Sequence, residues 1–231
     1  MNLFRREQKP VDIPEPLPKS PAAPDDGTKA VQVAVNPAPE PAPPPSVRPA
    51  PKPLAVPRYT YQSPARPAAG DRAEAERLFA QGVGAYKDHR LKDALTDYRA
   101  AVRADGSYFE AEFNVGVAAF DLDELPESLS AYETALAINP RSFNARFNFS
   151  LALKKAGYIQ DAATELERLL VICPPDERPE HLAMAHLTLA NLYAEEFHQP
   201  AAARPHYEKV LELDPHNSQA TAIRYWLRDN S

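Results

Sequence analysis

The chain has 231 residues, including 26 prolines and a single cysteine, and its formal net charge at neutral pH is −6. One cysteine excludes an intramolecular disulfide, and no stretch of sequence reaches the roughly 18–20 apolar residues needed to cross a bilayer. The prolines and the charges are unevenly distributed, and this divides the chain into two parts.

The first 70 residues are predicted to form a disordered arm. They contain 18 of the 26 prolines, and segments such as PAPEPAPPPSVRPAPKPLAVP have almost no aromatic residues and no helical periodicity. Such a composition buries too little apolar surface to offset the chain entropy lost on folding, about 1–2 kcal/mol per residue. We therefore predict a Pro/Ala-rich arm over residues 1–70 with a polyproline II bias.

Folded structure is predicted to begin at Asp71. Asp71 and Glu74 have the spacing of a capping box, directly before the first apolar residues with helical periodicity. Residues 71–231 can support one sizeable core. They contain 17 Lys and Arg against 26 Asp and Glu, a net charge of −9. Because an acidic domain is a poor match for a phosphate backbone, nucleic acid is not predicted as a partner.

Three successive segments repeat one pattern with a period of 34 residues. In the third, residues 143–176, apolar residues recur at three- and four-residue intervals on both sides of Gly157. This pattern indicates two amphipathic helices joined by a tight turn. The same pattern occupies residues 75–108 and 109–142. A constant period of this length marks stacked helix pairs, because one pair cannot bury both of its apolar faces alone.

The repeated residues resemble those of the tetratricopeptide-repeat family. Small residues recur at one position in each helix and a large apolar residue recurs in the second helix. The small residues are Gly82, Gly116 and Ser150, then Ala94, Ser128 and Ala162, and the large ones are Tyr98, Tyr132 and Leu166. The resemblance implies an all-α fold, a right-handed α-solenoid of about four helix pairs.

A fourth repeat and a terminal helix are predicted to complete the domain of residues 71–231. Residues 181–217 resemble the repeat, but the turn between the helices is about one residue longer. Pro205 predicts that the second helix either starts late, near Ala202, or is kinked. Residues 218–229 carry an apolar stripe opposite polar residues, which is typical of a capping helix.

The resemblance also indicates where a partner would bind. In the family, the first helices of successive pairs line a concave groove that holds an extended or helical peptide. Aromatic side chains at these positions suit apolar anchors, and Asn and Lys suit a peptide backbone or a negative charge. The corresponding candidate residues are Phe79, Val83, Tyr86, Phe113, Asn114, Val117, Phe120, Asn144, Phe147, Asn148, Leu151, Lys154, Lys155 and Asn191.

Two residues that differ from the family pattern indicate which kind of peptide would bind. Val83 and Asn144 stand where family members that clamp a C-terminal carboxylate have Asn and Lys. An internal apolar or amphipathic segment is therefore the predicted ligand.

No catalytic or metal chemistry is predicted. His181 and His186 are five residues apart, which does not place both on one helix face, and the histidines are interpreted as surface residues. Cys173 ends an apolar helix and is interpreted as a small buried hydrophobe. We therefore predict no enzymatic activity, no cofactor and no metal.

The leading functional hypothesis is a non-catalytic scaffold or adaptor that binds a peptide segment of a partner protein. A cytoplasmic location is expected, because residues 1–10 have positive charges with no apolar run behind them. One alternative is a structural tether whose Pro-rich arm docks elsewhere while the repeats self-associate. Another is an accessory subunit of an enzyme complex.

The sequence does not decide whether the predicted groove is empty or is filled by the protein's own arm. A covalently attached segment has a high effective concentration, and the segment LAVPRYTYQSP offers apolar anchors to the groove. These anchors are Leu54, Val56, Tyr59 and Tyr61.

Overall fold

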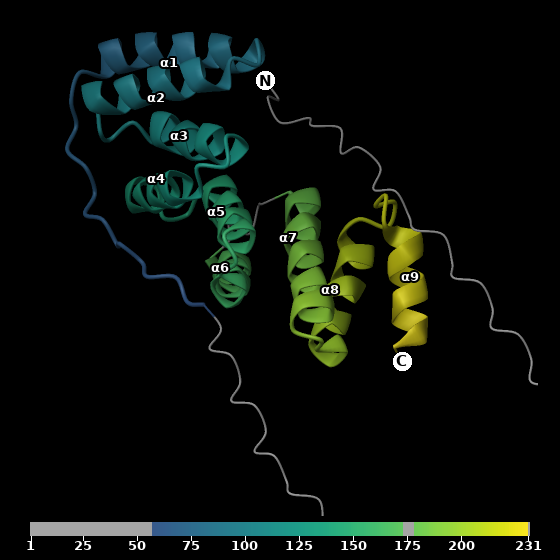
Figure 1. The fold of residues 1–231 in the computed structure, drawn as a ribbon. Helices are drawn as coiled ribbons and strands as arrows, with labels where there is room; N and C mark the ends of the chain where they lie inside the picture. Colours follow the sequence, from purple (N-terminus) through teal and green to yellow (C-terminus); the bar gives the residue numbers. More distant parts are fainter. Residues whose placement is uncertain (1–56, 173–177, 231) are drawn as a thin grey trace, which may run out of the picture. The chain divides into compact units, whose positions relative to one another are not determined.

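The computed structural model describes residues 57–172 and 178–230 (Figure 1). Residues 1–56, which make up most of the predicted arm, lie outside the described residues, as does Cys173. All regular elements of the described ranges are helical. None of these helices is both long and apolar enough to span a membrane.

The helices follow one another with short turns between them. In chain order the described elements are α1 Arg72–Lys87, α2 Leu91–Ala104, α3 Phe109–Asp121, α4 Leu125–Ile138, α5 Phe143–Lys155, α6 Ile159–Ile172, α7 Pro179–Asn191, the π-helical turn η1 Leu192–Glu196, α8 Pro200–Leu213 and α9 Ala220–Asp229.

The helices pack in consecutive pairs (Figure 1). Helix α1 packs on α2, α3 on α4, α5 on α6 and α7 on α8, and each pair contacts the next through α2 with α3, α4 with α5 and α6 with α7. Helix α9 packs on α8, where Ile223 and Trp226 join the apolar cluster of the fourth pair. The predicted all-α array of helix pairs with a terminal helix is confirmed.

Glycine allows the two helices of the first and second pairs to approach closely. A Cβ atom added at Gly116 would lie 2.6 Å from the ring of Tyr132, and one added at Gly82 would lie 2.7 Å from the ring of Tyr98. Both rings are buried, so neither has room to move aside. The small and large positions of the repeat are therefore complementary in volume.

The turn inside each helix pair contains one residue with positive φ. The φ angle is 59° at His89, 64° at Asp123 and 85° at Gly157, which are spaced by the repeat period, and 54° at His198. In the first three pairs the next amide donates to a carbonyl five residues earlier, at 2.8–2.9 Å. This closure at a left-handed residue ends the first helix and reverses the chain.

The fourth pair departs from the pattern in two places. Its first helix continues into η1, and a π-helical turn accommodates the extra residue that the sequence alignment requires. Helix α8 begins at Pro200 and runs through Pro205. Of the two predicted alternatives, the late start near Ala202 is therefore wrong, and the kink at Pro205 stays a prediction. A proline inside a helix removes one backbone hydrogen bond.

The start of α1 is fixed from two sides. The carboxylate of Asp71 accepts the amide of Glu74 at 3.1 Å, so Asp71 is the N-cap as predicted, but the reciprocal half of the capping box is not formed, because the carboxylate of Glu74 pairs with Arg77. The amide of Asp71 donates to the carbonyl of Ala104 at 2.8 Å, and the amide of Gly70 donates to the buried carboxylate of Asp105 at 3.0 Å. The chain before α1 is therefore tied to the end of α2.

Two histidines pair inside the fourth repeat. His186 of α7 and His206 of α8 face each other with their Nδ1 atoms 2.9 Å apart, and Tyr193 stacks on His206. The two rings are half-buried, in contrast to the surface position expected from the sequence. One ring nitrogen must donate and the other must accept, so the accepting ring is neutral. Burial, with the neighbouring His206, lowers the pKa of His186 to about 4.

The helix contact at Gly116 gives a first prediction. We expect Gly116→Ala to destabilise the domain by about 1–3 kcal/mol in urea unfolding followed by circular dichroism, because the added methyl group overpacks the buried ring of Tyr132. The matched control is Gly84→Ala, where the added Cβ atom would meet nothing within 4 Å beyond its own stretch of helix, and it should stabilise the helix by up to about 1 kcal/mol.

A rescue experiment separates overpacking from other effects of the Gly116 substitution. The third pair combines Ser150 with Leu166 at the equivalent positions. In a Tyr132→Leu background, Gly116→Ala should therefore cost nothing. An equal cost of Gly116→Ala in both backgrounds would show that the ring is not the cause.

The histidine pair gives a prediction on pH. Between pH 6.5 and about 4 the unfolded chain takes up a proton on His186 while the folded chain does not, so acidification favours unfolding. Allowing for its partial exposure, we expect His186 to account for about 1 kcal/mol of stability lost between pH 7.5 and pH 5. The measurement is urea unfolding at both pH values for the wild type, His186→Gln and the exposed control His216→Gln. The loss should shrink only in His186→Gln, and an identical loss in all three proteins would refute this assignment.

Candidate functional site

The predicted groove residues lie on the first helices of the pairs. Val83 of α1, Val117 of α3 and Leu151 of α5 occupy equivalent positions, 34 residues apart, and each is partly exposed. Because α1 contacts α3 and α3 contacts α5, these apolar side chains follow one another along adjacent helices.

Two of the predicted aromatic residues are part of the core. Phe113 is 6% exposed and Phe147 is 7% exposed. They stack on Phe109 and Phe143 with ring centroids 6.0 and 5.9 Å apart. Side chains buried to this degree have little surface to offer a ligand, and their main role is to pack the helix pairs.

Two more candidates are bonded within the chain. The hydroxyl of Tyr86 donates to the carboxylate of Asp121 at 2.5 Å, which links α1 to α3. The side-chain oxygen of Asn191 accepts the hydroxyl of Tyr207 at 2.8 Å, which links α7 to α8. Phe79, a further candidate, packs against Tyr98.

Lys155 joins the second and third pairs. Its ammonium group donates to the carbonyl of Phe120 at 3.1 Å, pairs with Asp123 at 2.8 Å and lies 4.6 Å from the centre of the Phe120 ring. This predicted contact residue therefore also stabilises the connection between neighbouring repeats.

The third pair keeps polar groups available on its first helix. Within the described ranges, the side chains of Asn144, Asn148 and Lys154 have no hydrogen-bond or ion-pair partner. Asn114 uses its amide nitrogen to donate to the carbonyl of Glu110 at 2.7 Å, which leaves its side-chain oxygen as an acceptor. The available polar side chains of the predicted groove thus concentrate on α3 and α5.

A segment assigned to the arm from the sequence lies against the second helices. Residues 57–70, here called the strap, run from α6 past α4 to the end of α2 without regular secondary structure (Figure 1). Tyr59 and Tyr61 pack edge-on against Phe149 with ring centroids 5.8 and 6.1 Å away. These tyrosines therefore do not fill the predicted groove of the first helices. Leu54 and Val56 lie outside the described residues.

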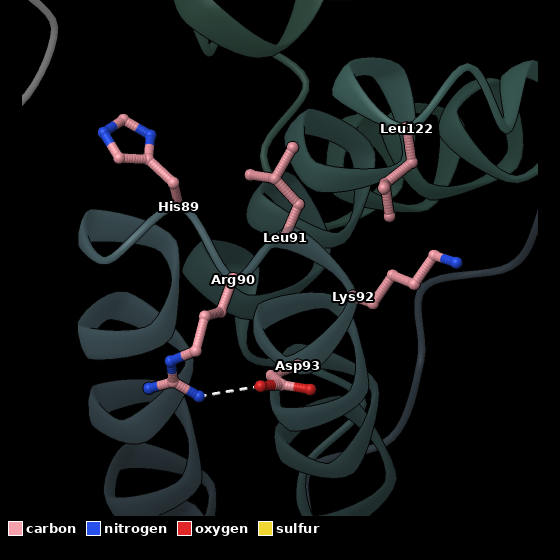
Figure 2. A pocket seen from close by; sticks show the side chains of 6 residues that line it. All are labelled: His89, Arg90, Leu91, Lys92, Asp93 and Leu122. Carbon is pink, nitrogen blue, oxygen red and sulfur yellow. Dashed lines mark hydrogen bonds and ion pairs between the residues drawn. The ribbon is translucent and has the colours of Figure 1, made fainter.

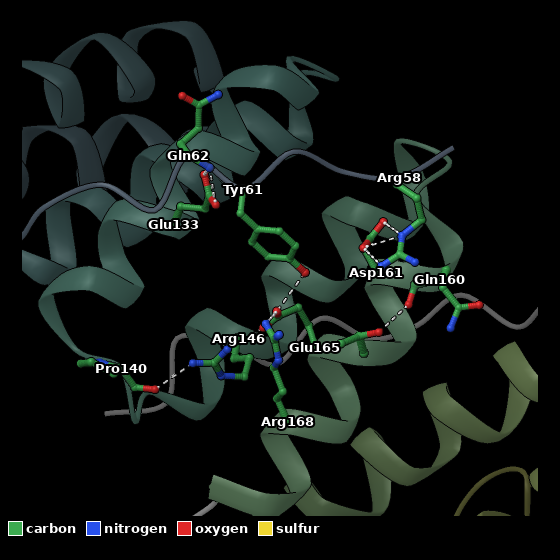
Figure 3. Close-up of polar contacts among 11 residues, drawn as sticks. Arg58, Tyr61, Gln62, Glu133, Pro140, Arg146, Gln160, Asp161, Glu165 and Arg168 are labelled. Atoms are coloured by element: carbon green, nitrogen blue, oxygen red, sulfur yellow. Dashed lines mark hydrogen bonds and ion pairs between the residues drawn. The ribbon is translucent and has the colours of Figure 1, made fainter. Parts of the chain in front are cut away.

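Buried carboxylates hold the strap in place (Figure 3). Asp161 accepts Nη2 and Nε of Arg58 at 2.9 and 3.1 Å and the backbone amide of Tyr59 at 2.8 Å. Glu133 accepts the backbone amide of Gln62 at 3.0 Å and the hydroxyl of Tyr59 at 3.2 Å. The carboxylates therefore bind backbone amides of the strap as well as its side chains.

Glu165 is the centre of the third polar contact (Figure 3). It accepts the hydroxyl of Tyr61 at 3.0 Å and is paired with Arg168 at 2.7 Å and with Arg146. Burial and the nearby Glu165 raise the pKa of the Tyr61 phenol, so it stays protonated and donates. The Nε atom of Arg146 is buried and has no hydrogen-bond partner in the described structure.

Sequence reasoning missed this strap site, although a signal was present. Asp161 and Glu165 are four residues apart on a predicted amphipathic helix, and both lie on its buried side. Buried carboxylates require donors or cations. The end of the arm supplies them in Arg58, Tyr59 and Tyr61.

A surface cavity of 380 Å³ lies at the turn of the first pair (Figure 2). Its lining includes Leu91 and Leu122 and the ion pair between Arg90 and Asp93, whose atoms are 2.8 Å apart. It contains none of the predicted groove residues. In the described part of the chain, no group of three or more His, Cys, Asp or Glu side chains is arranged to hold a metal ion.

Comparisons with known sequences and structures bear on the fold. No protein-family model matches the sequence, and no curated protein matches it significantly. Among solved structures, the chain resembles a tetratricopeptide repeat protein from Parabacteroides merdae, with a TM-score of 0.59 and 19% identity over 68% of this chain. The match spans only 60% of that protein.

Two further structures show the same likeness. YrrB, described as a TPR protein with an unusual peptide-binding site, has a TM-score of 0.56 and 19% identity over 67% of this chain and 76% of its own. PilF of Pseudomonas aeruginosa has a TM-score of 0.55 and 22% identity over 69% of this chain and 68% of its own. With the 34-residue period and the consecutive helix pairs, these likenesses show that the chain has the tetratricopeptide-repeat fold.

Proposed function

We propose that the chain is a non-catalytic adaptor that binds a peptide segment of a partner protein along α1, α3 and α5. The observation that supports this most directly is the row formed by Val83, Val117 and Leu151, which are partly exposed at equivalent positions of adjacent first helices. Apolar side chains spaced along one face suit the anchors of an extended or helical segment.

Polar groups beside this row would orient the bound segment. Asn148 and Lys154 have no partner in the described ranges, and Asn114 keeps a free acceptor oxygen. Amide side chains pair with peptide N–H and C=O groups, and a lysine favours a nearby carboxylate. The similar fold of YrrB, whose description names a peptide-binding site, is consistent with such use.

The second helices of the pairs are already contacted by the strap. The strap satisfies Glu133, Asp161 and Glu165 on the second helices and covers the ring of Phe149. A partner segment that used these groups would have to displace the strap, whereas a segment on the first helices would not.

The adaptor proposal is tested by site-specific photocrosslinking of the full chain in its source cell. A crosslinker at Asn148 on α5 should capture a partner that a crosslinker at the control position Thr164 on α6 does not. The captured segment is then synthesised and its affinity for the full chain is measured by calorimetry. We expect Asn148→Ala with Lys154→Glu to weaken binding at least about fivefold, since each polar contact contributes about 0.5–1.5 kcal/mol.

The control for this test is Thr164→Ala with Lys92→Glu, which likewise replaces one polar residue by alanine and one lysine by glutamate, but on second helices. It should leave the affinity unchanged. Equal affinities for both double variants, or a partner captured only from Thr164, would exclude the first-helix site.

The strap supports the tether as a second candidate function. Arg58 is held by hydrogen bonds to Asp161 on α6, so the described part of the chain begins at the third helix pair rather than at α1. A load on the arm would therefore reach α6 first. Several charge-assisted bonds at one point suit such an anchor.

The anchoring of the strap is measured by hydrogen exchange of the full chain. The amides of Tyr59 and Gln62 both donate to carboxylates, so they should be protected in the wild type. We expect Asp161→Ala to raise exchange in residues 57–64 at least about tenfold, because it removes charge-assisted bonds of about 1.5–3 kcal/mol.

Further variants decide whether Arg58 and Asp161 act as one unit. Arg58→Ala should raise exchange as well, and the double variant should be no worse than the more severe single one. Thr164→Ala on the same helix should change nothing. Exchange in Asp161→Ala equal to that of the wild type would mean that the clamp does not hold the strap.

A further inference from the structure

The cavity beside Tyr61 has a counterpart one repeat earlier. A cavity of 240 Å³ is lined by Tyr61 of the strap together with Glu133 of α4, Arg146 and Phe149 of α5, and Glu165 of α6. The residues 34 positions earlier line a separate cavity of 290 Å³ on α2, α3 and α4. We call this second cavity the α2–α4 pocket.

The α2–α4 pocket has the same construction with changed side chains. Where the third pair has Arg146, the second pair has Glu112, and where the third pair has Glu165, the second has Ala131. The buried ion pair of Arg146 and Glu165 is therefore replaced by a carboxyl group opposite a methyl group. Val115 stands in place of Phe149, which leaves more space in the pocket.

Glu112 has no partner for its charge. It is 9% exposed, and within the described ranges its carboxyl group makes no hydrogen bond or ion pair. A buried carboxyl group without a partner is costly to ionise. Burial, with a further contribution from Glu127, accordingly raises the pKa of Glu112 to about 7.

The other charged residues around the pocket do not supply the missing cation. Arg99 of α2 donates to Glu127 at 2.6 Å and also pairs with Glu124 at 3.2 Å, so its charge is already balanced. Arg103 of α2 is exposed to solvent at the rim of the pocket. Glu127 is the facing charge on α4, and it is held by Arg99.

We propose that the α2–α4 pocket binds the cationic side chain of an arginine or lysine in an extended segment of a partner protein, with its charge against Glu112. Beside the neighbouring cavity, Tyr61 of the strap donates its hydroxyl to the buried Glu165, so a side chain of an extended segment already pairs with a buried carboxylate at the equivalent place of the next repeat. Residues 71–231 carry a net charge of −9, which favours a basic partner.

The probe for this site is the peptide acetyl-Ala-Ala-Arg-Ala-Ala-amide, compared with the same peptide carrying citrulline in place of arginine. Citrulline has the same shape without the charge. Binding to the full chain is followed by NMR, with the Glu112 carboxyl carbon as a direct reporter. We expect the arginine peptide to bind at least tenfold more tightly and to lower the pKa of Glu112.

The pH dependence has a definite sign. The ligand requires the ionised carboxylate, so its affinity should rise about tenfold between pH 6 and pH 8 for a carboxyl group that titrates near 7. Glu112→Gln should abolish both the affinity for the arginine peptide and its pH dependence. Glu110→Gln, an exposed residue on the same helix, is the matched control and should bind as the wild type does.

Three results would overturn the proposal. The first is equal binding of the arginine and citrulline peptides, and the second is unchanged binding by Glu112→Gln. The third concerns Arg66, an exposed arginine of the strap. Binding that appears only in Arg66→Ala would show that the chain supplies its own cation, and the pocket would then serve no partner.

Discussion

The structure depends first on close contact between the two helices of each pair. Each helix has one apolar face toward the other helix of its pair and further apolar surface toward the neighbouring pairs. Only the stacking of several pairs buries all of this surface. The contact is close where Gly82 meets Tyr98 and where Gly116 meets Tyr132. Because a buried ring fills the space that a methyl group would need, the spacing of the helices is set by these few atoms. The proposed groove, the strap site and the α2–α4 pocket all lie on helices held at that spacing.

Much of the fold could be predicted because its rules are local and repeated. The small and large positions of the repeat, the tight turns and the cap at Asp71 are each read from a few neighbouring residues. The fourth pair was harder, because its differences are compensated by the backbone. The π-helical turn η1 takes up an extra residue, and α8 tolerates Pro205, and neither adjustment follows from local preference.

The candidate site was less predictable, since exposure depends on packing between distant segments. Val83, Val117 and Leu151 are partly exposed as a groove requires, but Phe113 and Phe147 at neighbouring groove positions are buried. The periodicity of a helix does not distinguish an aromatic ring that lines a groove from one that fills the space between helices. The end of the arm was also not predictable from local sequence alone. Its proline content predicts disorder, whereas Arg58 and Tyr59 near its end make bonds to residues about 100 positions away.

The repeat architecture allows side-chain charge to differ between pockets at equivalent positions. Equivalent positions have nearly the same backbone, so a change of side chain alters the chemistry of a pocket without moving it. At one such position the third pair has Arg146, whose charge is balanced inside the chain by Glu165, while the second pair has Glu112 opposite Ala131. A buried charge that is paired internally contributes to stability only weakly, but one left without a partner favours any ligand that supplies the opposite charge. The strap already follows this rule at Asp161, where a buried carboxylate is satisfied by an arginine from outside the helices.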